Sequence, residues 1–218
     1  EIDPGTRRNL EITRTLSGER KGSLLSMIDF TLTGPGGRLL SEWLSAPLTD
    51  LSKIVERHDA VEWLMVSRNC RESLASSLRE CPDMARSLSR LALDRGGPRD
   101  LAVIRDGLKK STAIQKLFLE PVHPSPVTGL LRLEVEKLGD FNKLIEILTR
   151  ALGQSLPVNY RDGGFIARGF SQELDQVLDL RDTGREFIVG MQADYASNTG
   201  IGSLKIKHNN AIGYFVEV

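Results

Sequence analysis

Residues 171–196 read SQELDQVLDLRDTGREFIVGMQADYA and contain no proline. Apolar side chains recur there with the three-to-four spacing of a helix face, at Phe170, Leu174, Val177, Ile188, Met191 and Tyr195. At 1.5 Å per residue, one helix of this length extends roughly 35–40 Å, more than a compact core of this size needs. Six acidic residues against two arginines would repel a phosphate backbone along it. The stretch therefore predicts an acidic spacer or lever helix rather than a track for DNA.

The pattern changes immediately after this stretch. Residues 203–208 alternate between apolar and basic or polar side chains, which is the period of a strand. Residues 209–213 predict a turn, and residues 214–218 predict a second strand. Lys205 and Lys207 fall on one face of the expected hairpin, with Leu204 and Ile206 on the other. Two ammonium groups in register suit contacts with phosphates that do not depend on base sequence. A lone hairpin is only marginally stable in water, so we expect it to belong to a larger sheet.

The chain before residue 170 is predicted to be a bundle of helices. We expect short buried helices at 23–28 and 38–44, separated by a tight turn at 34–37. Asp50 is the expected N-cap of a helix whose buried face carries Leu51, Ile54, Val55, His58, Val61 and Leu64 or Met65. Further helices are expected after Pro82, ending near Gly96, after Pro98, and over 130–152, with a loop at 121–126. The predicted fold class is mainly α, a multi-helix core bundle with a long lever helix and a short C-terminal hairpin.

Composition excludes several classes of protein. The chain has 218 residues, 29 Lys and Arg against 29 Asp and Glu, and a hydrophobic content of 40%, as in ordinary globular proteins. Zero net charge argues against a protein that coats nucleic acid broadly. Two cysteines without CxxC spacing indicate a reducing compartment. No apolar run has the roughly 20 residues of a membrane span. The first residue is not Met, and the last lies in a strand-like run, so we expect a piece of a longer protein.

Motifs for chemistry are mostly absent. The chain contains no GxxxxGK[ST], GxSxG or HExxH, and His58, His123 and His208 are scattered. The turn at 34–37 could hold an anion, although a structural turn is the favoured interpretation. Residues 86–116 carry a local basic surplus, which is interpreted as a solvated helix surface. We therefore predict no enzymatic activity, no metal site and no cofactor site in this chain.

The strongest signal is a resemblance that runs through nearly the whole chain. Residues 23–48 (SLLSMIDFTLTGPGGRLLSEWLSAPL) resemble the core-domain signature of the MutS family of DNA mismatch-recognition ATPases. The resemblance includes RNLEI at 8–12, IVERHDAVEWL at 54–64, PRDL at 98–101 and DGGFI at 162–166. It continues in order through ELD at 173–175, TGIGSLKI at 199–206 and GYFVEV at 213–218. Because these matches are collinear, they are far more specific than any one short motif.

The resemblance implies an architecture and a role. Residues 1–170 would be the helical core domain, 171–198 the lever helix, and 199–218 the start of the truncated DNA clamp domain. Lys205, Lys207 and Asn209 would contact the DNA backbone, and the segment would link that contact to the parent's ATPase. ATP and Mg²⁺ would bind in the missing ATPase domain. Expected partners of the intact protein are mismatched duplex DNA, a second copy in a homodimer and a downstream repair protein, with no membrane, in the bacterial cytoplasm. The alternative function is a helical scaffold or protein-interaction module that never contacts DNA.

Overall fold

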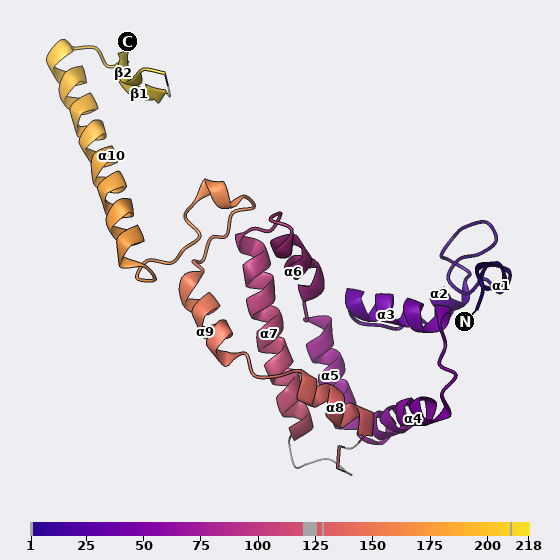
Figure 1. The fold of residues 1–218 in the computed structure, drawn as a ribbon. Helices are drawn as coiled ribbons and strands as arrows, with labels where there is room; N and C mark the ends of the chain where they lie inside the picture. The colour runs from indigo at the N-terminus through magenta and orange to yellow at the C-terminus, as the bar shows by residue number, and fades with distance from the viewer. Residues whose placement is uncertain (1, 120–125, 128, 210) are drawn as a thin grey trace. The chain divides into compact units, whose positions relative to one another are not determined.

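The chain is mainly α-helical and ends in one antiparallel hairpin, as predicted (Figure 1). The structure, a computed structural model, describes residues 2–119, 126–127, 129–209 and 211–218. It divides into two compact units, Glu1–Phe165 and Ile166–Val218, and we describe each by itself. No described helix is both long and apolar enough to cross a membrane.

The first unit is built around one central helix, α7. Its helices are α1 (Pro4–Asn9), α2 (Leu24–Ile28), α3 (Gly34–Ser45), α4 (Leu51–Val66), α5 (Arg68–Arg79), α6 (Met84–Ala92), α7 (Pro98–Leu119), α8 (Gly129–Lys137) and α9 (Asn142–Ala151), with a 3-10 turn at Tyr160–Asp162. Helices α5, α6, α8 and α9 all contact α7, and α4 contacts α5 and α8. The central position of α7 explains why seven of its residues are buried.

The core of this unit joins four helices. Its buried members are Trp63 of α4, Cys70 of α5, Ile114 and Phe118 of α7, and Val135 of α8. The rings of Trp63 and Phe118 stack with centroids 5.8 Å apart and planes inclined by 28°. Large apolar and aromatic side chains contribute most of the free energy of burial, so this cluster is the main source of stability for the unit.

Side-chain caps fix several helix starts. Asp50 caps α4 as predicted, because its Oδ1 accepts the Ser52 N–H at 2.9 Å. Thr33 caps α3 by accepting the Gly36 N–H at 3.0 Å. The glycines at 34–37 therefore form the first turn of α3 and not a separate turn between helices, which corrects the prediction for this stretch. The cap explains the difference, since it satisfies a backbone donor that a glycine-rich start would leave free.

Other boundaries also differ from the prediction. The single helix expected over 130–152 is two helices, α8 and α9, because Gly139 adopts a φ of +65° that ends the first. Helix α5 was not predicted, and α6 ends at Ala92, before the Gly96–Gly97 pair. The loop predicted at 121–126 lies, except for Pro126, outside the described residues, as does His123.

The predicted buried faces of the early helices are largely wrong. In α2 only Leu25 is buried, and α3 buries none of its residues. In α4 the predicted face is mostly exposed, His58 included, whereas Trp63 is the buried residue. Tertiary contacts override the local pattern here, because the contacts of α4 with α5 and α8 use the side that carries Trp63.

The second unit consists of a long helix and the hairpin. Helix α10 runs without interruption over Gln172–Thr199, which confirms the single long helix predicted for this stretch. Ser171 caps its start by accepting the Leu174 N–H at 3.2 Å, and Gly200 ends it with a left-handed φ of +70°. Strands β1 (Lys205–Asn209) and β2 (Gly213–Glu217) form the hairpin. The assignment of the core, lever and clamp domains to 1–170, 171–198 and 199–218 concerns a full-length protein and stays a prediction.

Candidate nucleic-acid interface

The hairpin register decides which side chains share a face. Lys205 lies opposite Glu217, Lys207 opposite Phe215, and Asn209 opposite Gly213. Residues directly opposite in an antiparallel pair point to the same side of the sheet, and alternate residues along a strand do too. All three predicted contact residues therefore lie on one face of the hairpin, which we call the lysine face.

Both lysines on this face are exposed. Lys207 forms an ion pair with Glu217, and the two side chains are 52% and 51% exposed. An ion pair this exposed contributes little to stability, so a competing anion can displace the carboxylate at small cost. Lys205 lies directly opposite the same glutamate. The lysine face thus presents two ammonium groups against one carboxylate.

Asn209 also has a structural role, in the turn that the sequence predicts at 209–213. Its Oδ1 accepts the backbone N–H groups of Ala211 at 3.0 Å and Ile212 at 2.9 Å, which closes the hairpin turn. A side-chain amide also has two N–H donors. In this geometry the oxygen holds the turn, and only the NH₂ group is suited to donate to a ligand.

The opposite face and the outer edge of β1 attach the hairpin to α10. Ile206 pairs with Val216, and His208 contacts Tyr214 edge to face with ring centroids 4.8 Å apart. The Ile206 N–H donates to Oε1 of Gln192 in α10 at 2.9 Å, and Leu204 is buried. Sequence reasoning missed Gln192, because a single glutamine on a helix carries no signal for a contact 14 residues away. The contact fixes the lysine face relative to the end of α10.

The negative charge of α10 is organised by an arginine outside the helix. Arg168 contacts Asp179 at 2.6 Å and Asp182 at 3.1 Å, and it also donates to the carbonyl oxygen of Asp175. At the start of the helix, the carboxylate of Glu173 accepts hydrogen bonds from the backbone N–H of Glu173 and from the Ser171 hydroxyl. These bonds hold the pKa of Glu173 below its usual value. The six acids of the helix outnumber Arg168, Arg181 and Arg185, so the shaft of α10 carries a net negative charge.

Half of the eight basic residues in the stretch at 86–116 form ion pairs within the first unit. Arg90 pairs with Asp100, Arg105 with Asp106 at 2.8 Å, and Lys110 with Glu80. Arg86 pairs with Asp83 at 3.3 Å. These pairs support the interpretation of this stretch as a solvated helix surface with internal ion pairs.

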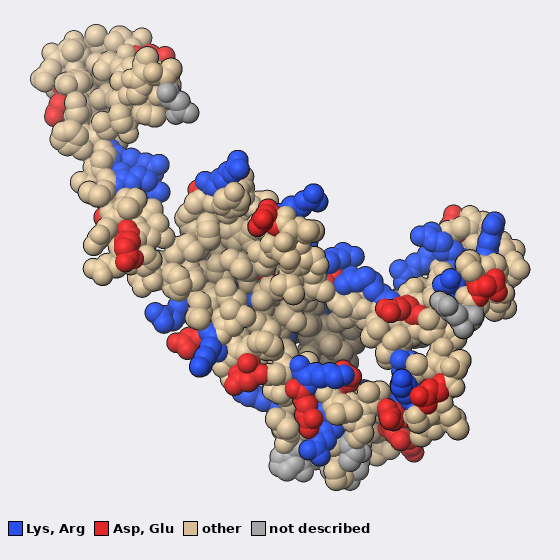
Figure 2. Space-filling view, in the orientation of Figure 1, with Lys and Arg blue, Asp and Glu red and all other residues tan. Residues whose placement is uncertain are grey.

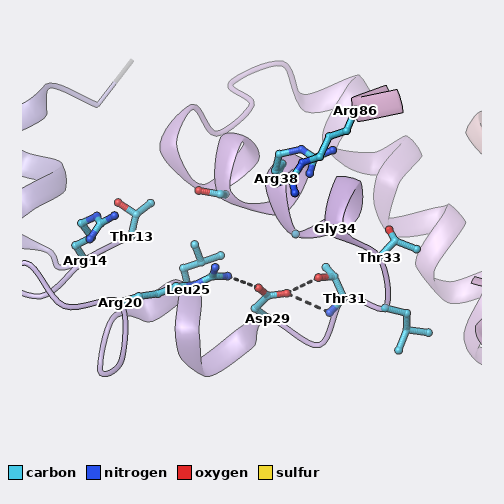
Figure 3. A pocket seen from close by; sticks show the side chains of 13 residues that line it. Thr13, Arg14, Arg20, Leu25, Asp29, Thr31, Thr33, Gly34, Arg38 and Arg86 are labelled. Atoms are coloured by element: carbon cyan, nitrogen blue, oxygen red, sulfur yellow. Dashed lines mark hydrogen bonds and ion pairs between the residues drawn. The ribbon is translucent and has the colours of Figure 1, made fainter. Parts of the chain in front are cut away.

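The start of α3 lines a pocket of about 770 Å³ (Figure 3). Gly34 and Gly37, which line it, belong to the stretch that the sequence suggested could hold an anion, whereas the four arginines were not foreseen. Four arginines line it: Arg14, Arg20, Arg38 and Arg86. Figure 3 shows Arg38 and Arg86 side by side above the Arg20–Asp29–Thr31 contacts.

In the described part of the chain, no three His, Cys, Asp or Glu side chains are grouped in a way that could hold a metal ion.

The geometry defines a class: a mainly helical domain that carries a basic hairpin at the end of a long acidic helix. Residues 5–210 match the family model described as MutS domain III. The chain is 51% identical over its full length to the DNA mismatch repair protein MutS of Cereibacter sphaeroides, and 49% identical to that of Rhodopseudomonas palustris. The Ruegeria pomeroyi protein of the same name is 50% identical over 219 aligned positions.

The chain therefore belongs to the MutS family of DNA mismatch repair proteins and corresponds to domain III, which confirms the resemblance. It spans about a quarter of the length of the relatives that it matches, 24% in each case.

Proposed function

We propose that this chain is the core-and-lever segment of a DNA mismatch-recognition protein and that its hairpin contacts the DNA backbone. Lys205 and Lys207 would donate to phosphates, and the NH₂ group of Asn209 would add a third contact. The observation that supports this most directly is the lysine face itself, on which two exposed ammonium groups share one side of a hairpin attached to α10 through Gln192.

The charges favour a contact at the hairpin only. Phosphate contacts by lysine are strong, independent of base sequence and sensitive to salt. A phosphate that approaches Lys207 competes with the exposed carboxylate of Glu217. One that approaches the shaft of α10 meets a net negative charge, because six acidic residues of the helix outnumber its two arginines. We infer that α10 acts as a stiff connection, so that a rigid-body movement at the start of the helix is passed to the hairpin at its end.

The remaining roles are proposals about the full-length protein. We propose that it binds mismatched duplex DNA, acts as a homodimer with a downstream repair protein, and works in the bacterial cytoplasm. ATP and Mg²⁺ would bind in an ATPase domain outside this segment. This segment would make or break no bond, and its role would be to link DNA contact to that ATPase.

The test measures the salt dependence of heteroduplex binding by the full-length protein. Each phosphate contact contributes about 0.9 to the slope of log affinity against log salt on duplex DNA. Lys205→Ala with Lys207→Ala should therefore reduce the slope by about 1.8. The matched control is Lys109→Ala with Lys116→Ala, which removes the same charge from exposed positions of α7 and should leave the slope unchanged.

A third variant tests the same geometry from the other strand. Glu217→Gln releases Lys207 and removes a negative charge, so it should tighten binding. An unchanged slope in the hairpin variant, or an equal drop in the α7 control, would remove the lysine face from DNA contact. Absence of DNA binding by the full-length protein would favour the scaffold alternative.

A further inference from the structure

The arginine pocket at the start of α3 has no role in the proposed DNA contact. We define it by Arg14, Arg20, Arg38 and Arg86, together with Asp29. The arginines come from stretches far apart in the sequence: the loop between α1 and α2, the first turns of α3, and α6. Figure 2 shows blue side chains gathered over the region between α3 and α6.

Internal carboxylates orient these arginines without neutralising them. Asp83 receives Arg38 through two contacts, at 2.9 and 3.1 Å, and Arg86 at 3.3 Å. The hydrogen bond from Arg38 holds the pKa of Asp83 below its usual value, so the carboxylate is charged at neutral pH. Arg20 contacts Asp29 at 2.6 Å. Arg14 donates to the Gly18 carbonyl oxygen at 2.9 Å. Four positive charges thus meet two negative ones.

Each guanidinium keeps donors for another anion. Arginine has five N–H donors, and the contacts above use one or two nitrogens in each residue. The side chains of Arg20, Arg38 and Arg86 are 61%, 45% and 68% exposed. Arginine forks match carboxylates and phosphates in geometry and bind them through paired hydrogen bonds. The pocket is therefore built for an anionic group.

The lining favours an acidic stretch of protein over a nucleotide. No aromatic side chain lines the pocket, so a base could stack only on a guanidinium plane, and a lone phosphate would fill little of the volume. Leu32 lines it, and Met27 lines an adjoining pocket that shares Arg20 and Asp29. Phe30, which follows Asp29 in the sequence, is 85% exposed. Arginine mixed with exposed Met and Phe is typical of protein interfaces.

We propose that the arginine pocket docks an acidic segment from the remaining part of the same full-length protein. About three quarters of the length of the matched relatives lies outside this chain, so such segments have ample length to come from. Aspartate or glutamate side chains would bind the free guanidinium donors, and neighbouring apolar residues would cover Met27 and Phe30. This inference is independent of DNA contact by the hairpin.

The first test uses zero-length cross-linking in the full-length protein. Lys21 is exposed and lines the adjoining pocket, so carbodiimide should join its amine to a carboxylate of the docked segment. Peptide mapping should find that carboxylate outside residues 1–218. The proposal is overturned if Lys21 joins only residues of this chain or nothing at all. It is also overturned if mixed isotopically light and heavy protein shows that the link joins two copies.

The second test compares amide hydrogen exchange in full-length variants. Arg14→Glu with Arg86→Glu should speed exchange over residues 11–33 by at least about tenfold and abolish the Lys21 cross-link, because the occupant is repelled. The matched control is Arg150→Glu on α9, an exposed arginine that does not line the pocket. It should change neither measurement.

A lysine variant separates docking from local unfolding. Arg14→Lys with Arg86→Lys keeps the charge and should retain the cross-link. Exchange over 11–33 that is unchanged in the glutamate variant would overturn the proposal. Protection of this stretch that arises only when duplex DNA is added would do the same and would assign the pocket to nucleic acid.

Discussion

At the scale of single residues, the buried carboxylate of Asp100 stands out. Its side chain is 12% exposed, and it accepts Nε of Arg90 at 2.9 Å and the Gly97 N–H at 3.0 Å. These contacts tie the start of α7 to α6. The hydrogen bond from Arg90, followed by that from Gly97, holds the pKa of Asp100 below its usual 3.8.

Asp100→Asn should destabilise the first unit by about 1–3 kcal/mol at pH 7, because a charged acceptor is replaced by a neutral amide beside two donors. The lowered pKa gives the pH dependence. The carboxylate contributes stability above the unfolded value of 3.8 and loses it as the pH falls through the lower folded value. The difference between wild type and variant should therefore shrink when urea unfolding is repeated at pH 3.

The control for this prediction is Asp106→Asn. Asp106 pairs with Arg105 on the same helix, but its side chain is 52% exposed. It should change the free energy of unfolding at pH 7 by less than about 0.5 kcal/mol. Equal changes in the free energy of unfolding for the two substitutions would show that the contacts of Asp100 stabilise the unit no more than an exposed ion pair does.

At the scale of elements, the glycines of α7 and α10 differ in whether a neighbouring helix leaves room for a side chain. Gly107 lies where α6 crosses α7, and an added Cβ would lie 2.2 Å from Sδ and 2.3 Å from Cγ of Met84. Gly190 in α10 has no atom within 4 Å of that position. The first glycine permits close packing of two helices, whereas the second only lowers the helix propensity of an exposed shaft.

Gly107→Ala should therefore cost about 1–3 kcal/mol through overpacking, measured by urea unfolding. Gly190→Ala should instead stabilise α10 by about 1 kcal/mol, read from slower amide exchange in that helix. In a double-mutant cycle, Gly107→Ala should cost little free energy of unfolding when Met84→Ala is already present, because the clashing side chain is gone. If Gly107→Ala stabilises the protein as Gly190→Ala does, the close α6–α7 contact is wrong.

At the scale of the whole molecule, one aromatic cluster holds the first unit together. Trp63→Ala should destabilise that unit by about 3–5 kcal/mol, because it removes a buried ring from the junction of α4, α5, α7 and α8. Trp43→Ala is the matched control, since Trp43 is 41% exposed and contacts Arg57 by a cation–π interaction. The expected cost there is about 1 kcal/mol or less. Urea midpoints of the two variants would coincide if Trp63 were not the centre of the core.

The second unit buries no residue of α10, so local signals carried its prediction. The absence of proline and the helical spacing of apolar side chains predicted one long helix. The Ser171 cap and the Gly200 end, which the structure shows, are short-range features as well. Alternation of residue type likewise placed Lys205 and Lys207 on one face of a hairpin. In the same way, collinear similarity assigned the chain to its family, since such similarity needs no three-dimensional information.

Only the tertiary structure decided which helix faces are buried and which distant side chains meet. The exposed apolar residues of α4 have the same spacing as a buried face, and the contacts around Trp63 alone distinguish them. Gln192 meets Ile206 across a gap of 14 residues. The four arginines of the α3 pocket come together across gaps of up to 72 residues. Sequence periodicity reports neighbours within one or two turns, whereas these contacts depend on how whole elements pack against one another.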